Sequence, residues 1–179
     1  MICANVGRCL EILLKENEKF PPCKKRKDCI EFFDGRTVVK CEEKGIEYYI
    51  HNHMPSEIKM GRIHVEEHMV MQPDQKCDYM VVMKMKDKAE VVLVELKNKN
   101  NYRHAIRQLE QTLENLSDEL TPYHSVHGRL IWRTKKAPKM NADPILLKLS
   151  RNFKKRNGDF KMEGSPFKES SSDFLGCDS

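Results

Sequence analysis

The residues best suited to chemistry are three charged side chains, Asp78, Glu95 and Lys97, which lie in the most apolar part of the sequence. Residues 77–97 indicate two apolar strands joined by a charged turn, so the start of the first strand lies beside the end of the second. Because side chains alternate across a strand, Glu95 and Lys97 share one face. A carboxylate and an ammonium at the edge of a buried strand are costly to desolvate unless they pair or take part in chemistry. We therefore expect the three side chains to gather at one place.

Two carboxylates and a lysine in such an arrangement indicate phosphoryl chemistry. Carboxylate oxygens are ligands for Mg²⁺ or Mn²⁺, which keep several waters and bridge to substrate phosphates. A lysine beside the ion can orient or deprotonate a water for in-line attack on phosphorus. The structural alternative is that Glu95 and Lys97 mark the point where the strand leaves the core and pair with each other.

The spacing of these residues also matches a known pattern. Sixteen residues separate Asp78 from Glu95, Lys97 follows after one more, and the next segment is an amphipathic helix that contains Gln108. This order resembles the signature of the PD-(D/E)XK nuclease superfamily, which has the restriction-endonuclease-like fold. The resemblance implies a divalent metal held by Asp78, Glu95 and the backbone carbonyl of Leu96, with Lys97 beside the attacking water. It also implies that Gln108 faces the site and orients it.

Two positions depart from the superfamily pattern. Cys77 precedes Asp78, where proline is usual, and Thr112 stands four residues after Gln108. The exonuclease-type motif has tyrosine at that second position, so its absence favours an endonuclease. The superfamily sometimes draws an extra acidic ligand from its first helix, and a supporting acid on the strand before the hairpin is a further option. The candidates, each of which has a solvated position as its alternative, are Glu11, Glu16, Glu18, Glu66 and Glu67.

Composition favours a protein that meets polyanions. The net charge is +5, and from Asp159 onward two lysines face five acidic residues, a net of −3, so residues 1–158 carry +8. That excess favours a nucleic-acid partner. No run approaches the ~20 apolar residues of a membrane helix, and the N-terminus lacks the basic region of a signal peptide. Seven cysteines without regular spacing predict reduced thiols in an intracellular compartment, cytoplasmic or nuclear.

The elements that must position the charged residues follow from hydrophobic periodicity, turns and caps. We expect a helix over residues 2–18, strands within 29–51, a strand over 62–71, the central hairpin, a helix over 102–119, a strand over 126–134 and a helix from Asp143 to Gly158. The Asp34-Gly35 pair predicts a hairpin turn between strands at 29–33 and 37–41.

This order of elements predicts an α/β protein with a mixed central β-sheet flanked by helices. The resemblance implies that the fold is restriction-endonuclease-like. We expect one nuclease-like domain over residues 1–158. From residue 159 the composition turns to Ser, Lys, Glu and Gly, which predicts a flexible tail over residues 159–179.

The sequence thus predicts a Mg²⁺- or Mn²⁺-dependent nuclease that hydrolyses phosphodiester bonds, with an endonuclease acting on DNA as the favoured form. The alternative is a catalytically inactive module on the same fold that binds nucleic acid or a protein, or an accessory subunit of a larger defence or repair complex. Double-strand cutting by this fold usually needs two active sites, so the resemblance implies a homodimer. No membrane partner is expected.

Overall fold

The computed structural model describes residues 10, 13–14, 30–65, 76–98, 102–134 and 143–176, and the structural statements below concern these residues. The strands are β1 (Ile30–Asp34), β2 (Val38–Glu43), β3 (Ile46–His51), β4 (Lys59–His64), β5 (Tyr79–Met85), β6 (Lys88–Lys97), β7 (Ser125–Trp132), β8 (Phe160–Gly164) and β9 (Phe167–Ser170). The helices are α3 (Tyr102–Asn115), α4 (Pro144–Lys154) and α5 (Ser172–Leu175). Most of the helix expected over 2–18, and all five candidates for a further acidic ligand, lie outside the described residues.

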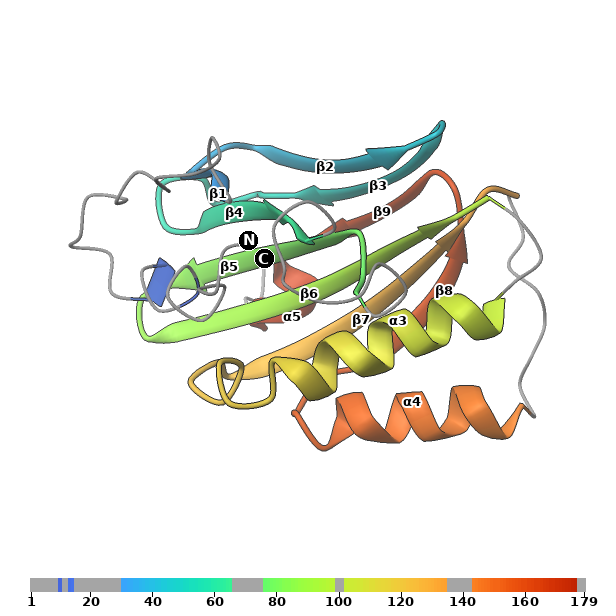
Figure 1. Ribbon diagram of the computed structural model, residues 1–179. Coiled ribbons are helices and arrows are strands. Elements are labelled where there is room, and N and C mark those ends of the chain that lie inside the picture. Colours follow the sequence, from blue (N-terminus) through green and yellow to red (C-terminus); the bar gives the residue numbers. More distant parts are fainter. Residues whose placement is uncertain are drawn as a thin grey trace, which may run out of the picture.

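Two sheets form the framework of the described part (Figure 1). The larger sheet has six strands in the order β1-β4-β5-β6-β7-β8. Its strands β4, β5 and β6 are successively antiparallel, whereas β6, β7 and β8 are parallel, and α3 forms the connection from β6 to β7. The smaller sheet has the order β2-β3-β9, with β9 parallel to β3. The predicted α/β class with a mixed sheet and packed helices is confirmed.

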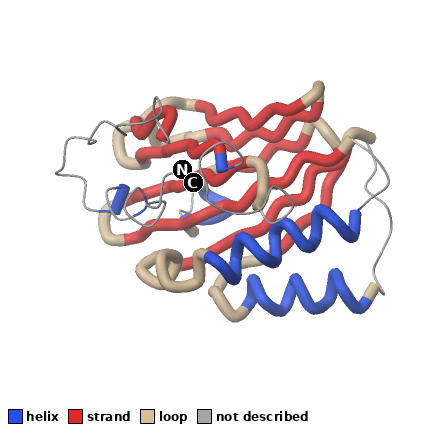
Figure 2. The backbone as a smooth tube through the Cα atoms, viewed as in Figure 1, coloured by secondary structure: helices blue, strands red, loops and turns tan. Residues whose placement is uncertain are grey.

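The larger sheet lies between helices α3 and α4 on one side and the smaller sheet on the other, as the tube in Figure 2 shows, and α5 packs on the side of the smaller sheet. On one face, Leu93 of β6 belongs to a core cluster with Leu109 of α3 and Leu149 of α4. On the other face, Val92 belongs to a second cluster with Ile50 of β3. Successive residues of β6 therefore enter opposite cores, which explains why the strand is apolar on both faces. Each fully buried Val or Leu there contributes about 1.5–3 kcal/mol.

The hairpin predicted around Asp34 and Gly35 is wrong. β1 pairs with β4 in the larger sheet, and β2 pairs with β3 in the smaller one, so the turn carries the chain from one sheet to the other. A Cβ at Gly35 would lie 2.0 Å from the carbonyl oxygen of Pro55, so glycine is needed where the turn meets that loop. The turn is held by Arg36, whose Nε donates to Oδ1 of Asp34 at 2.8 Å. The Asp-Gly signal marked a real turn but gave the wrong strand pairing.

The flexible tail predicted over residues 159–179 is wrong for residues 160–175. β8 pairs with β7, β9 pairs with β3, and α5 follows, so the folded domain extends past residue 158. The reason is that single phenylalanines anchor this polar segment. Phe160 stacks on Phe153 of α4 with ring centroids 6.1 Å apart, and Phe174 is buried in the core between the sheets. The average composition of the segment does not reveal single buried residues of this kind.

The start predicted for α4 is confirmed. Oδ1 of Asp143 accepts a hydrogen bond from the backbone N–H of Ile145 at 2.9 Å, and Pro144 occupies the first helical position. The buried stripe predicted for α3 is also present, and it contains Ala105, Ile106, Leu109 and Leu113. Within the described ranges, no helix combines the length and apolar character required to cross a membrane.

Candidate metal and catalytic site

Asp78 and Glu95 face each other across the central hairpin of the larger sheet. In the antiparallel register Tyr79 pairs with Val94, so one step further places Asp78 opposite Glu95. Both side chains are buried, and that of Glu95 is 0% exposed. They lie on the α3 face, because Glu95 alternates with Leu93, which enters the core beneath that helix. The sheet thus brings two carboxylates together inside the protein.

Asp78 is fixed from the sheet side by two hydrogen bonds. Its Oδ2 accepts from the backbone N–H of Leu96 at 2.6 Å, and its backbone carbonyl accepts from the N–H of Val65 at 2.9 Å. The first of these bonds ties the Asp78 carboxylate to the residue that follows Glu95. The two acidic residues therefore hold a defined relative position.

Glu95 has an unusual environment for a carboxylate. Its Oε1 lies 2.5 Å from Nζ of Lys97, whose side chain is 21% exposed and reaches the surface at the end of β6. Both carboxylate oxygens of Glu95 are buried, and neither makes a hydrogen bond among the described residues, so Oε1 has only the ion-pair contact with Lys97 and Oε2 has neither. Burial, reinforced by the nearby Asp78, raises the pKa of the Glu95 carboxyl well above its usual value, although Lys97 acts in the opposite direction. This carboxylate lacks a full set of partners, and its charged form is disfavoured as it stands.

Gln108 reaches the site from α3. Its Nε2 donates to the backbone carbonyl of Lys76 at 2.9 Å, two residues before Asp78. Because that carbonyl can only accept, the amide nitrogen is fixed on this side and Oε1 on the other. Oε1 of Gln108 is buried and, like Oε2 of Glu95, has no hydrogen-bond partner in the described part of the chain.

The two orphaned oxygens allow a test of whether a metal fits here. Oε1 of Gln108 only accepts hydrogen bonds, and so does Oε2 of Glu95 in its ionised form, so the groups that would complete this form of the site are a cation or donors such as water. Against this, no group of three or more His, Cys, Asp or Glu side chains gathers in metal-binding geometry within the described ranges. Mg²⁺ needs only one or two carboxylates, because it retains several waters. The two carboxylates of Asp78 and Glu95 are compatible in number with that kind of site.

Cys77, which lies next to Asp78 in the sequence, packs as an apolar residue in the core beneath α3. Its side chain is fully buried, and burial raises the pKa of its thiol well above the usual value, with further contributions from Glu95 and Asp78. A neutral buried thiol is unreactive. The residue that replaces proline in the superfamily pattern therefore adds no charge to the site.

Exposed basic side chains lie on the elements that carry this arrangement or follow it. Arg133 follows β7, its backbone N–H donates to the carbonyl of Lys97 at 3.0 Å, and its Nη1 donates to Oδ1 of Asn98 at 2.7 Å. Arg103 and Arg107 lie one turn apart on the exposed side of α3. Arg133 thus places positive charge at the end of β6, and Arg103 and Arg107 add positive charge to the surface of α3.

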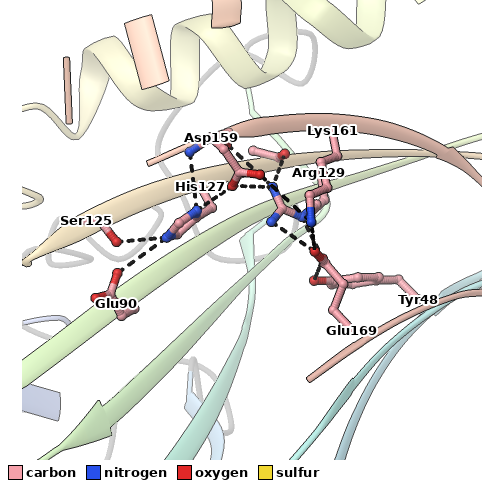
Figure 3. Close-up of polar contacts among 9 residues, drawn as sticks. Tyr48, Glu90, Ser125, His127, Arg129, Asp159, Lys161 and Glu169 are labelled. Atoms are coloured by element: carbon pink, nitrogen blue, oxygen red, sulfur yellow. Dashed lines mark hydrogen bonds and ion pairs between the residues drawn. The ribbon is translucent and has the colours of Figure 1, made fainter. Parts of the chain in front are cut away.

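A second polar cluster lies on the opposite face of the larger sheet, and the sequence interpretation missed it (Figure 3). His127 of β7 contacts Oγ of Ser125 through Nε2 at 2.7 Å and Oδ1 of Asp159 through Nδ1 at 2.5 Å. Oε2 of Glu90 lies 3.4 Å from the same Nε2. The order serine, histidine, aspartate resembles a nucleophilic relay, but Ser125 is only 4% exposed and Asp159 is the open end. In a catalytic relay the serine would be accessible to the substrate and the aspartate would be buried. We therefore interpret this cluster as a structural hydrogen-bond network.

Arg129 extends the same cluster to the smaller sheet. Its Nε donates to Oε2 of Glu169 at 2.6 Å, and its Nη1 donates to Oδ1 of Asp159 at 2.9 Å. Glu169 also accepts from the Tyr48 hydroxyl and from Nζ of Lys161, both at 2.7 Å (Figure 3). Burial would raise the pKa of Glu169, but the bonds from Arg129 outweigh it and lower that pKa. The sequence contains an indication of this cluster, because the polar residues His127 and Arg129 lie on the same face of a strand that is otherwise mostly apolar.

The structure brings Asp78, Glu95 and Lys97 together, and it places Gln108 against the segment that leads into Asp78. Comparisons with protein-family models, with curated proteins and with solved structures found no match to this chain.

Proposed function

We propose that the protein is a divalent-metal-dependent nuclease of restriction-endonuclease-like fold that hydrolyses phosphodiester bonds, with DNA as substrate and endonucleolytic cutting as its mode. One observation carries the proposal. Two carboxylates, Asp78 and Glu95, are buried side by side, one oxygen of Glu95 has no partner in the described part, and the Lys97 ammonium lies at the exposed edge of the same group. Burying two adjacent carboxylates costs desolvation free energy, and this cost is explained if the site binds a cation and takes part in catalysis.

Each residue has a distinct task in this proposal. Asp78, Glu95 and the backbone carbonyl of Leu96 would hold Mg²⁺ or Mn²⁺. The ion would neutralise charge that develops on the phosphate and make water a better nucleophile. Lys97 offers three N–H donors beside Glu95, and it would orient the attacking water and stabilise the negative charge. Gln108 would keep the segment before Asp78 in place.

Positive charge near the site supports a polyanionic substrate. Arg103 and Arg107 are exposed on the helix that carries Gln108, and Arg133 lies beside the end of β6. Such side chains bind phosphates without reading base sequence. Cutting both strands of a duplex would require two sites, which a homodimer or a larger complex would supply. The buried free thiols of Cys41 and Cys77 suit an intracellular compartment.

A second candidate function is a catalytically inactive module that binds nucleic acid or a protein, alone or as an accessory subunit of a defence or repair complex. The contact of 2.5 Å between Glu95 and Lys97 favours it, because it is the internal ion pair expected of such a protein. The unpaired Oε2 of Glu95 argues against it, since a purely structural pair would be expected to satisfy both oxygens.

The role of Lys97 provides the test of the proposal. In the presence of Mn²⁺, Lys97→Ala should abolish cleavage of DNA while it leaves DNA binding largely unchanged. Lys88→Ala is the matched control, because Lys88 begins the same strand at the opposite, exposed end. Full cleavage by a pure preparation of Lys97→Ala would overturn the mechanism. Metal binding separates the two candidates, because the inactive module has no reason to bind Mn²⁺ through Asp78 and Glu95.

A further inference from the structure

The position of Asp78 depends on the three residues that lead into β5. The pairing between β5 and β6 begins at Tyr79, so Asp78 lies one residue before the first paired position. On the sheet side, bonds to Val65 and Leu96 hold Asp78. The peptide group that joins Lys76 to Cys77 contacts α3 instead, because its carbonyl and its N–H are both bonded by side chains of that helix. The hydrogen bonds from α3 to this peptide group therefore set the path of the chain into Asp78.

Thr112 of α3 binds the residue directly before Asp78. Its Oγ1 accepts a hydrogen bond from the backbone N–H of Cys77 at 2.8 Å and donates to the backbone carbonyl of Gln108 at 2.7 Å. Gln108, one helical turn earlier, donates to the carbonyl of Lys76 at 2.9 Å. Residues four apart on a helix share a face, so the two side chains grip consecutive residues of the same segment. We call this pair of contacts the α3 clamp.

Helix formation does not explain a threonine at this position. Thr112 is fully buried, and threonine is a poorer helix former than leucine or alanine. A threonine hydroxyl that bonds the carbonyl four residues earlier gives the helix no gain in stability. The same hydroxyl satisfies a buried N–H next to a predicted metal ligand, which valine of nearly the same shape could not do. The bond to Cys77 is therefore the reason for the hydroxyl.

We propose that Thr112 is a positioning residue of the nuclease site, which acts through Cys77 to set the place of the Asp78 carboxylate. The inference rests on the proposed function, because it assigns Thr112 a role toward the metal ligand Asp78. Groups that support a metal ligand from behind typically account for about 10- to 100-fold in metal affinity or activity. Thr112 stands where the exonuclease-type motif has tyrosine, so the clamp assigns a specific task to a residue that departs from that motif.

The test measures Mn²⁺ affinity by calorimetry for the full chain and for Thr112→Val, Thr112→Ser and Thr121→Val. Thr112→Val removes the hydroxyl, whereas Thr112→Ser retains it. Thr121 makes the same kind of bond, from Oγ1 to the carbonyl of Ser117 at 3.0 Å, on the exposed surface away from the site, so Thr121→Val is the matched control. Glu95→Ala serves as the reference for a lost metal ligand.

The expected result is that Thr112→Val weakens Mn²⁺ binding by about 10- to 100-fold, while Thr112→Ser and Thr121→Val stay close to wild type. The kcat for DNA cleavage should fall in parallel, with KM unchanged, because the clamp positions a ligand and does not touch the substrate. Loss of stability alone would not produce this pattern at a temperature where every variant is folded.

Two results would overturn the inference in distinguishable ways. Wild-type Mn²⁺ affinity in Thr112→Val, with binding lost in Glu95→Ala, would overturn the clamp and leave the proposed function standing. Absence of Mn²⁺ binding and of cleavage in the wild type would overturn the proposed function and the clamp together. If Thr112→Val does not fold, Thr112→Ala replaces it, and unchanged affinity in that variant would likewise overturn the inference.

Discussion

Nζ of Lys97 lies 2.5 Å from Oε1 of Glu95, on the same face of the same strand, while Oε2 of that carboxylate has no partner in the described part of the chain. The ammonium forms an ion pair with one oxygen, and neither oxygen of the carboxylate makes a hydrogen bond in the described part. A pair that served stability alone would be better replaced by apolar side chains, because burying two charges costs more than their attraction returns. The proposed function explains why a buried carboxylate with too few hydrogen-bond partners is present at this place.

Replacement of Glu95 by glutamine should stabilise the metal-free protein. Burial and the neighbouring Asp78 raise the pKa of Glu95 in the folded state above its ordinary value of 4.5. The folded protein thus binds this proton more tightly than the unfolded chain, and the resulting stability is full below about pH 4.5 and is lost as pH rises. With EDTA present at pH 8, Glu95→Gln should gain about 1–2 kcal/mol in the free energy of unfolding, within the range of stabilising active-site substitutions.

Urea unfolding at pH 5 and pH 8 measures this gain. The difference between Glu95→Gln and wild type should shrink at pH 5, and the exposed substitution Glu57→Gln should show no gain at either pH. A variant that is less stable than wild type at pH 8 would mean that the Glu95–Lys97 pair is a net source of stability.

The His127 cluster should make stability depend on pH near neutrality. Burial alone would lower the pKa of His127, but the bonds to Asp159 and Glu90 outweigh it and raise that pKa above 6.5. The stability gained from the protonated ring is full below about pH 6.5 and is lost as pH rises through the folded-state pKa. The stability advantage of wild type over His127→Gln should therefore be largest at pH 6 and shrink by pH 9.

Chemical unfolding across that pH range checks the contribution of His127, and the exposed His124→Gln is the matched control. An advantage of wild type that grows between pH 6 and pH 9 would show that the neutral ring is the stabilising form.

Arg129 should be essential for attachment of the C-terminal segment. Its side chain is buried and bonds both Glu169 and Asp159, so Arg129→Met would leave the Glu169 carboxylate buried and only partly compensated by Lys161. Removing one partner of a buried ion pair typically costs about 3–5 kcal/mol. Thermal unfolding should show this loss, and the double variant Arg129→Met/Glu169→Leu should recover part of it.

The control for Arg129 is Arg36→Met, which breaks the exposed pair between Arg36 and Asp34. Exposed pairs contribute less than about 1 kcal/mol. Equal losses in Arg36→Met and Arg129→Met would contradict the importance assigned to the buried cluster.

The proximity of the candidate residues could be predicted from the sequence because its determinants are local. One hairpin and one helix hold Asp78, Glu95, Lys97 and Gln108, and alternation along a single strand fixes which side chains share a face. The α3 clamp went unnoticed because it joins side chains of a helix to backbone groups of a distant segment. Nothing in the spacing of Thr112 and Cys77 indicates a bond between a hydroxyl and a peptide N–H.

Long-range pairing accounts for the predictions that were wrong. β9 pairs with β3 across more than a hundred residues, and no turn signal announces a parallel partner of that kind. The Asp34-Gly35 turn is real, yet tertiary structure sends its two strands into different sheets. At Asp34-Gly35 the local pattern gave the turn and tertiary packing decided the partners of its strands, whereas the polar composition of residues 159–179 did not indicate the strand β9 at all.

The most direct test of the central claim is cleavage of plasmid and single-stranded DNA by the purified protein with Mn²⁺, Mg²⁺ or EDTA, with Glu95→Ala in parallel. The account predicts cutting that requires the metal, stops in EDTA and is lost in Glu95→Ala while that variant remains folded. Cutting that persists in EDTA or in Glu95→Ala would contradict the site. A wild-type protein that neither cuts nor binds Mn²⁺ would contradict the nuclease and favour the inactive binding module.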